Sequence, residues 1–302
     1  MTYSQQEVDS CWAEEWQIAK EIGWNCALID QSWMFGGEVK SRYLIPEQNV
    51  IYRGWLLNQD SHRKLFAFLD QREYQLIPSP LHYQFSCSFP KWYFSGDLRK
   101  YTPKSYVVHQ GVWLDALLKN PEELSTIIQM KFEKDSGLII KDFVKSRKHE
   151  WLDACYVPNI SDGENLNRVV HNFVQRQKSD GVFEGGLIFR EYVPFKKIGV
   201  HPKSGLPLVN EHRIFVFRGQ IFFQVPYWLN VKADYTNTAV PNSKYLQRLV
   251  EKIFLHTDFF AMDVAELDSG EWLMVELNDG STAGLPEGAD LKDFYSKLLA
   301  LQ

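Results

Sequence analysis

Hydrophobic residues recur with the period of a helix in some segments of the chain and with the period of a strand in others. Val8, Trp12, Trp16 and Ala19 recur at helical spacing and predict an amphipathic helix over residues 5–22. The same criteria predict helices at 61–73, 112–133, 163–178, 242–257 and 291–301. Strands are predicted at 24–30, 49–55, 74–78, 137–143, 185–195, 211–217, 220–225, 259–267 and 271–278. This order of elements indicates an α/β or α+β architecture.

Two features of this pattern suggest how the chain is organised. Residues 84–104 are rich in aromatic side chains and show no clear period, and Pro103 ends any helix that precedes it. We therefore expect a domain boundary within residues 101–105. Further on, two pairs of strands are separated by short turn sequences, Arg218-Gly219 in the first pair and 268–270 in the second, which predicts two hairpins.

The composition fits a globular protein and narrows its partners. The chain has 302 residues, of which 45% are apolar and 24% charged, enough for one large or two ordinary domains. A net charge of −5 does not favour binding to nucleic acid. The four cysteines lack zinc-site spacing, so we expect reduced thiols and a cytoplasmic protein. With neither a signal sequence nor an apolar run near the ~18 residues of a membrane span, we expect no membrane partner.

The last hairpin carries an acidic face. Alternation in its second strand places Glu276 and Asn278 on the face of Trp272 and Met274, and a two-residue turn would set Asp263 directly opposite Glu276. Opposed side chains have Cβ atoms about 4.5–5.5 Å apart, so two carboxylates there repel unless a cation lies between them. Three oxygen donors on one face suit Mg²⁺. The alternative is an exposed face with solvated acids, and a three-residue loop would shift the pairing.

A basic cluster follows one of the apolar strands. Lys141 ends that strand, and the loop after it supplies Lys145, Arg147, Lys148 and His149. So many potential cations within nine residues favour a phosphate-binding site. The alternative is a solvated basic loop.

Three further charged residues lie in strands that are otherwise apolar. Arg190 and Glu191 belong either to a binding site or to the polar face of an edge strand. Arg213 shares its face with Glu211 and two phenylalanines, and it either stacks on the rings or points into a cleft. A two-residue turn would give Arg213 the neighbour Gln224 across the hairpin, which is not an acid. This leaves the guanidinium available for a phosphate.

Taken in order, these features resemble the ATP-grasp superfamily. The segments that carry the resemblance are GLIIKDF (137–143), FREYV (189–193), EHRIFVFRGQI (211–221) and DVAELDSGEWLMVELNDGS (263–281). The chain looks closest to the third family of the clade named for one arginine and two lysines. VIYRGW (50–55) and YTPKS (101–105) also resemble that family, so the resemblance covers nearly the whole chain.

The resemblance implies an α/β fold in which two α+β subdomains grip ATP, preceded by a small Rossmann-like pre-ATP-grasp domain. We expect this first domain at residues 1–103 and the ATP-grasp domain at 104–302. The two subdomains would then cover about 104–186 and 187–302.

The resemblance also implies roles for individual residues. Lys104, or alternatively Lys91, would be a first ATP-binding lysine, and Lys141 would contact the α-phosphate and adenine region. The strand at the adenine would contain Arg190, Glu191, Tyr192 and Val193.

The remaining roles concern phosphates and metal. Arg213 would reach the γ-phosphate or an acyl phosphate, and one or two Mg²⁺ ions would be bound by Asp263, Glu276 and Asn278. Many ATP-grasp enzymes cover the phosphates with a glycine-rich loop, but the loop here has no glycine. Side chains would replace it: Lys145 for binding, and Arg147 and Lys148 beside Arg213 in catalysis.

The activity expected from the resemblance is ligation of a carboxylate to an amine, or to a thiol, through an acyl phosphate. The substrates would be small molecules, peptides or proteins, with ATP and Mg²⁺ as cofactors. One alternative is an assembly factor of the ATP-grasp type that binds ATP without turning it over, and another is a phosphotransferase. Arg53 and the aromatic segment 83–94 either line the substrate side or pack in the core.

Overall fold

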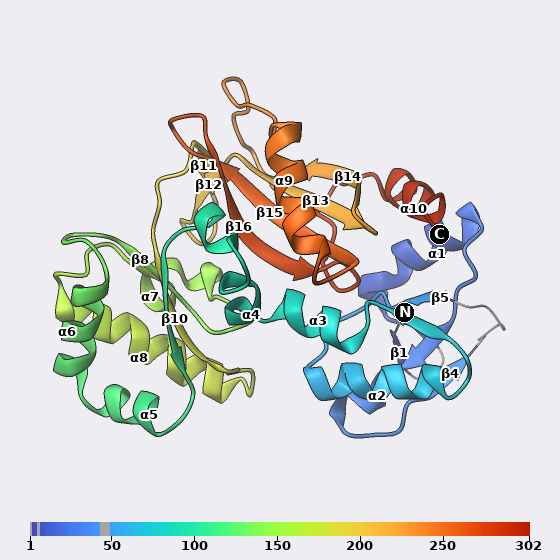
Figure 1. Ribbon diagram of the computed structural model, residues 1–302, viewed down its shortest axis with the longest axis horizontal. Helices are drawn as coiled ribbons and strands as arrows, with labels where there is room; N and C mark the ends of the chain where they lie inside the picture. The colour runs from blue at the N-terminus through green and yellow to red at the C-terminus, as the bar shows by residue number, and fades with distance from the viewer. Residues whose placement is uncertain (1, 5–6, 43–48) are drawn as a thin grey trace.

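The computed structural model describes residues 2–4, 7–42 and 49–302. Two four-stranded sheets dominate this part of the chain, and an N-terminal portion packs beside the second of them (Figure 1). All four cysteines are free. Among the described residues, no helix combines the length and the apolar character that crossing a membrane requires.

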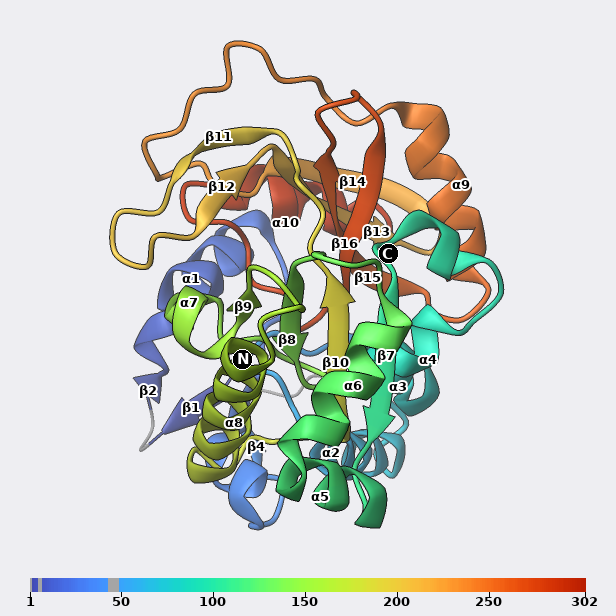
Figure 2. The same cartoon turned by 90° about the vertical axis from the view of Figure 1, so that its left-hand side faces the viewer.

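The first sheet is antiparallel and is covered by helices. Its strands lie in the order β7-β10-β8-β9. Their bounds are β7 Ser105–His109, β8 Leu138–Lys141, β9 Tyr156–Val157 and β10 Gly186–Glu191. Figure 2 looks onto the helices that pack against this sheet, namely α5 Val112–Lys119, α6 Pro121–Lys131 and α8 Gly163–Ser179, near the short α7 Trp151–Ala154. The single helix expected over 112–133 is broken because Pro121 starts a new helix that Asn120 caps.

The second sheet is also antiparallel, in the order β14-β13-β15-β16. The two expected hairpins supply its strands, β13 Glu211–Phe217, β14 Gln220–Pro226, β15 Phe259–Glu266 and β16 Trp272–Asp279. Helix α9 (Ser243–Phe254) packs on one face and α10 (Leu291–Leu299) on the other. A separate ribbon pairs β11 (Lys197–Val200) with β12 (Pro207–Val209).

In the residues that the structure describes, the N-terminal portion contains two small sheets and the helices α1 and α2. One sheet contains β1 Thr2–Ser4, β2 Glu7–Val8, β3 Leu28–Asp30 and β4 Ser41–Arg42. The other is the parallel pair β5 Asn49–Ile51 and β6 Gln75–Ile77. The helices are α1 (Ala13–Ile22) and α2 (Gln59–Asp70). The helix expected over 5–22 thus begins only at Ala13, after β2 and a short 3-10 turn, and residues 5–6 lie outside the described part.

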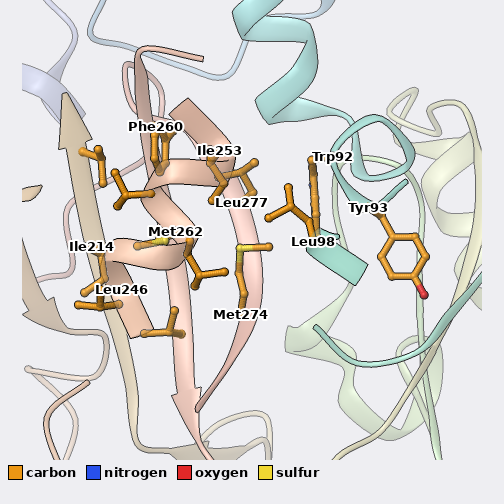
Figure 3. Close-up of a cluster of buried hydrophobic side chains, with 14 of the residues drawn as sticks. Trp92, Tyr93, Leu98, Ile214, Leu246, Ile253, Phe260, Met262, Met274 and Leu277 are labelled. Carbon is orange, nitrogen blue, oxygen red and sulfur yellow. The ribbon is translucent and has the colours of Figure 1, made fainter. Parts of the chain in front are cut away.

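The aromatic segment expected to be irregular is largely helical. It forms α3 (Pro80–Cys87) and α4 (Phe89–Tyr93), followed by a 3-10 turn. Ser79 caps α3 and Pro80 occupies its first turn, a start signal that is visible in the sequence. Figure 3 shows Trp92 and Leu98 beside Met274 and Leu277 of β16. The core of the second sheet therefore includes residues that precede the expected boundary at 103.

The chain passes from the first sheet to the second later than expected. The expected division between residues 186 and 187 falls inside β10, which pairs with both β7 and β8 and so belongs wholly to the first sheet. The crossing therefore follows Glu191. The expected limit between a first domain ending at residue 103 and an ATP-grasp domain starting at 104 remains a prediction. In the described part of the chain, buried side chains from both sides of this limit pack in one core.

Arg53 ties the N-terminal portion to the C-terminal end of the chain. It is 4% exposed and forms an ion pair with Glu15 of α1, with Nη2 and Oε2 2.9 Å apart. Its Nη1 donates to the carbonyl oxygens of Gly280, Ser281 and Ala283, which follow β16. Of the two roles considered for Arg53, the structure supports packing and bonding in the core.

We predict that Arg53→Leu destabilises the protein strongly. The substitution removes the cation that pairs with Glu15 and the donor to three carbonyl oxygens, and breaking a buried pair typically costs about 3–5 kcal/mol. The free energy of unfolding from urea titration measures the loss. Arg63→Leu is the matched control, because Arg63 and its partner Asp60 are both exposed, and we expect no measurable change there. Equal effects of the two substitutions would contradict the assignment.

Candidate active site

A cavity of about 590 Å³ lies between the two sheets and the N-terminal portion. Its volume is within the range of about 300–1,000 Å³ that is usual for small-molecule sites. Most residues predicted from the sequence line this cavity, namely Lys141, Lys145, Lys148, Arg190, Glu191, Tyr192, Val193, Arg213, Asp263, Glu276 and Asn278. Apolar side chains that include Phe89, Ile139 and Leu277 complete the lining.

Asp263 and Glu276 are directly opposed across β15 and β16, as predicted. The loop length and the strand register that produce this pairing differ from those expected. The hairpin loop has three residues, 268–270, closed by a hydrogen bond from the Leu267 amide to the Glu271 carbonyl. The register then shifts between Val264 and Asp263, because β16 contains one extra residue at this point.

The bulge in β16 also changes which side chains share a face. Trp272 and Met274, before the bulge, are buried in the core, where they pack with Leu277. Glu276 and Asn278, after the bulge, line the cavity. The expectation that all four residues share one face was therefore wrong, since the bulge reverses the alternation between Met274 and Glu276.

Each of the two opposed carboxylates is paired with a cation. Arg213 binds Asp263 through two hydrogen bonds, from Nε to Oδ1 at 2.8 Å and from Nη2 to Oδ2 at 2.7 Å. Lys141 Nζ donates to Glu276 Oε1 at 2.8 Å. Burial acts to raise the pKa of Glu276, but Lys141, together with Lys148 and Arg213, lowers that pKa overall. The repulsion expected between the two acids is thus neutralised by the protein's own side chains.

The expected neighbour of Arg213 was wrong. The Arg218-Gly219 turn has two residues, but a register shift in β14 places Val225, rather than Gln224, across from Arg213. On its other side β13 pairs with β15, and there Arg213 lies directly opposite Asp263. The arginine is therefore already bound to an anion.

Two further cations connect the cavity walls. Arg190 of β10 is buried, and it donates to Thr102 Oγ1 and to the Val275 and Met274 carbonyls of β16. Burial lowers the pKa of Arg190 to about 10. Lys148 Nζ is 3.1 Å from Tyr227 Oη and lies over that ring. Both contacts join the first sheet or its loop to the second sheet.

Arg147 and Lys104 lie outside the cavity lining. Arg147 is bound to Glu150, Gln177 and Asp180, so it fastens the basic loop to helix α8 and its end. Lys104 is exposed, with Nζ 5.5 Å from the centre of the Phe132 ring. Lys91, the alternative to Lys104, is exposed as well and does not line the cavity.

Glu211 is a lining residue to which the sequence analysis assigned no role. The pKa of Glu211 is raised to about 8, mainly by burial and also by the nearby Asp263 carboxylate, while Lys148 and Arg213 oppose the rise. The signal was present in β13, where alternation places Glu211 on the face of Arg213. Within the described residues, no three histidine, cysteine, aspartate or glutamate side chains form a ready metal-binding group.

The two sheets, with a cavity lined by cations and carboxylates between them, define an ATP-grasp protein. Residues 131–298 match the model of an ATP-grasp domain, family 3 of the clade named for one arginine and two lysines. This match spans more than half of the chain, and the chain belongs to that family. The fold and the family expected from the sequence are confirmed.

Solved structures of ATP-grasp proteins have the same fold. A RimK domain ATP-grasp protein from Sphaerobacter thermophilus is 11% identical with a TM-score of 0.58, covering 99% of this chain and 97% of its own. The ATP-grasp ligase PsnB, in complex with a minimal precursor, is 14% identical with a TM-score of 0.56 (100% and 98%). The D-cycloserine synthetase DcsG is 14% identical with a TM-score of 0.52 (95% and 93%). No curated protein matches the chain.

We predict that Glu211 makes folding stability depend on pH. Its raised pKa means that folding takes up a proton between pH 4.5 and about 8, so the free energy of unfolding falls as pH rises through that window. Burial also raises the pKa of Asp279, to about 6, so the upper part of the window isolates Glu211. From about pH 6.5 to 8 the expected loss is at most about 2 kcal/mol.

Urea titrations of the nucleotide-free protein in EDTA, at constant ionic strength, measure this loss. Glu211→Gln should flatten the profile above about pH 6.5. Glu164→Gln removes an exposed acid of α8 and should leave the profile unchanged. A flat wild-type profile would contradict the prediction.

Proposed function

We propose that this protein is an ATP-dependent ligase that joins a carboxylate to an amine. In the first step, a carboxylate oxygen of the substrate attacks the γ-phosphorus of ATP, the bond to ADP breaks, and an acyl phosphate forms. In the second step, an amine nitrogen attacks the acyl carbon, the bond to phosphate breaks, and phosphate and one proton leave as the amide forms. Membership of the ATP-grasp family supports this reaction class.

The observation that carries the proposal is the arrangement of charge in the cavity. Lys141, Lys148, Arg190 and Arg213 line one space but come from both sheets and from the basic loop. Cations of this kind bind phosphate oxygens, and guanidinium groups do so with two parallel hydrogen bonds. Phosphoryl transfer requires positioning and charge neutralisation more than proton transfer, which this set of side chains provides.

The donor set fits Mg²⁺. Asp263 and Glu276 are carboxylates on paired positions, and Asn278 lies close enough for its Nδ2 to be 3.4 Å from Asp263 Oδ2. Oxygen donors that leave positions free for phosphate suit this ion. Mg²⁺ held by these three residues would neutralise and orient the β- and γ-phosphates. One structure of the ligase PsnB contains Mg and ADP.

The ion pairs in the cavity join the same cations and carboxylates that would contact ATP and Mg²⁺ on this proposal. Lys141 pairs with Glu276 and Arg213 pairs with Asp263, so each carboxylate is held in place by a cation. Arg213 is further oriented by a hydrogen bond from Nη1 to the Gly284 carbonyl at 2.6 Å. On this proposal, phosphate oxygens and Mg²⁺ would take over from the carboxylate–cation pairs.

We predict that the protein forms hydroxamates from carboxylic acids when hydroxylamine serves as the amine. Hydroxylamine traps an acyl phosphate, so ADP and hydroxamate should appear together in a screen of amino acids and peptides with Mg-ATP. Glu276→Gln should abolish ADP release. It should also lower thermal stability, because the ammonium of Lys141, whose side chain is 6% exposed, loses its partner. Glu271→Gln, an exposed acid on the same hairpin, is the control.

This experiment separates the proposal from its alternatives. ATP binding without ADP release from any acid in the screen would favour an assembly factor. ADP release with a stable phosphorylated product and no hydroxamate would favour a phosphotransferase. Full activity of Glu276→Gln would overturn the metal assignment.

We predict different effects for two neighbouring cations of the basic loop. Lys148→Met should weaken ATP binding by about tenfold, the scale of one lost charge-assisted hydrogen bond. Arg147→Gln should leave ATP affinity within about twofold, because its guanidinium is bound to acids outside the cavity. Calorimetry with a non-hydrolysable ATP analogue and Mg²⁺ measures both affinities. The reverse ranking would restore Arg147 as the phosphate ligand.

A further inference from the structure

The basic loop after β8 begins as a small closed hairpin. Lys141 and Ser146 pair in an isolated antiparallel bridge, and between them the Asp142 amide donates to the Lys145 carbonyl at 3.0 Å. Lys145 and Ser146 both line the cavity. The hairpin thus contributes a lysine and a serine to the cavity from a backbone that is bonded to itself.

Asp142 holds this hairpin from the inside. The residue is 0% exposed, and its Oδ1 accepts hydrogen bonds from the amides of Val144 at 2.8 Å and Lys145 at 2.6 Å. Its Oδ2 accepts from Nε2 of Gln177, a residue of α8, at 2.7 Å. Burying a carboxylate is costly unless donors replace the lost water, and these three donors do so.

Gln177 connects the beginning of the basic loop to its end. It is 4% exposed, and while its Nε2 donates to Asp142, its Oε1 accepts from Arg147 Nη1 at 3.0 Å. A carboxylate on one side and a guanidinium on the other fix which way this amide points. Because Arg147 is also bound to Glu150 and Asp180, the end of the loop does not depend on Gln177 alone.

All four backbone amides of residues 142–145 are hydrogen-bonded inside the protein. Those of Asp142, Val144 and Lys145 are used within the hairpin. The amide of Phe143 donates to the carbonyl of Glu184 at 3.3 Å. Glycine-rich loops bind phosphate with backbone amides. Since the amides of this hairpin are already bonded, its side chains have to take that role.

We infer that Asp142 and Gln177 are positioning residues that preform the basic loop for binding phosphate. The loop then contacts ATP through the side chains of Lys145 and Ser146, while its backbone stays bonded to the protein. Ordering the backbone of one loop residue lowers an affinity by roughly tenfold, and a preformed loop avoids this loss. The inference rests on the proposed function in that the phosphates of ATP enter this cavity.

Hydrogen exchange of the nucleotide-free wild-type protein tests whether the loop is preformed. The amides of Val144 and Lys145 should exchange at least about tenfold more slowly than in an unstructured peptide. Mg²⁺ with a non-hydrolysable ATP analogue should add little to this protection. Amides that exchange as in an unstructured peptide until the nucleotide is added would overturn the inference, and this measurement needs no variant.

Calorimetry with two probes measures what Asp142 does for binding. One probe is the ATP analogue with Mg²⁺, and the other is adenosine, which has no phosphate and is titrated in competition. Asp142→Ala removes the acceptor of two loop amides, so it should weaken binding of the ATP analogue about tenfold and leave that of adenosine within about twofold. Asp142→Asn keeps one acceptor oxygen and should stay within about threefold of the wild type for both probes.

Two glutamines of α8 provide a matched pair of variants. Gln177→Met removes the donor to Asp142 Oδ2 and should weaken binding of the ATP analogue by about threefold to tenfold, the scale of one hydrogen bond. Gln175 is exposed on the same helix, and Gln175→Met should leave the affinity unchanged.

The variants distinguish positioning from other roles of Asp142. In Asp142→Ala, equal losses for the ATP analogue and adenosine would indicate a role in folding only, and unchanged affinity for the ATP analogue would indicate no role; either result overturns the inference. A loss in Asp142→Asn as large as in Asp142→Ala would show that charge matters and would overturn it as well. If Asp142→Ala does not fold, Gln177→Met and the wild-type exchange decide.

The result is separable from that of the hydroxamate screen, because neither hydrogen exchange nor binding requires turnover. Protected loop amides and the expected loss for the ATP analogue, without hydroxamate formation, would contradict the ligase reaction and leave the preformed loop standing.

Discussion

The rest of the site depends on how two opposed carboxylates are kept side by side. Asp263 and Glu276 lie across from each other on β15 and β16, where like charges would push the strands apart. Arg213 neutralises one acid from the neighbouring strand of the same sheet, and Lys141 neutralises the other from the first sheet. Because Lys141 belongs to β8, the second pair also fixes how closely the two sheets approach.

The same ion pairs involve the side chains that would bind ATP and Mg²⁺ on the proposed function. Buried ion pairs contribute little net stability, because desolvation offsets most of their attraction. On the proposed function, they would therefore be exchanged for contacts with Mg²⁺ and phosphate at small cost, provided that every charge keeps a partner. Asp279 stands apart from this scheme, since no cation in the described part of the chain pairs with it.

The sequence predicted the acidic pair correctly through two errors that cancel. A two-residue turn pairs Asp263 with Glu276, and so does a three-residue loop followed by a bulge. The bulge adds one residue to β16 and restores the register beyond it. The two routes differ in which side chains share a face of β16, because the bulge leaves Met274 buried in the core. Alternation along a strand identifies side-chain faces correctly as far as the next bulge, and the sequence carries no clear signal for the bulge itself.

Local sequence patterns do not predict ion-pair partners that come from strands or helices far away in the sequence. The turn between β13 and β14 relates Arg213 only to the strand that follows it in sequence, whereas the acid that binds Arg213 lies fifty residues later on β15. Two neighbouring residues of the basic loop also bind different partners. Arg147 and Lys148 are adjacent and equally charged, yet one is bound to acceptors on α8 and beyond while the other reaches the cavity. Residue type shows that a charge needs a partner, but which partner it finds is decided by the topology that brings strands and helices together.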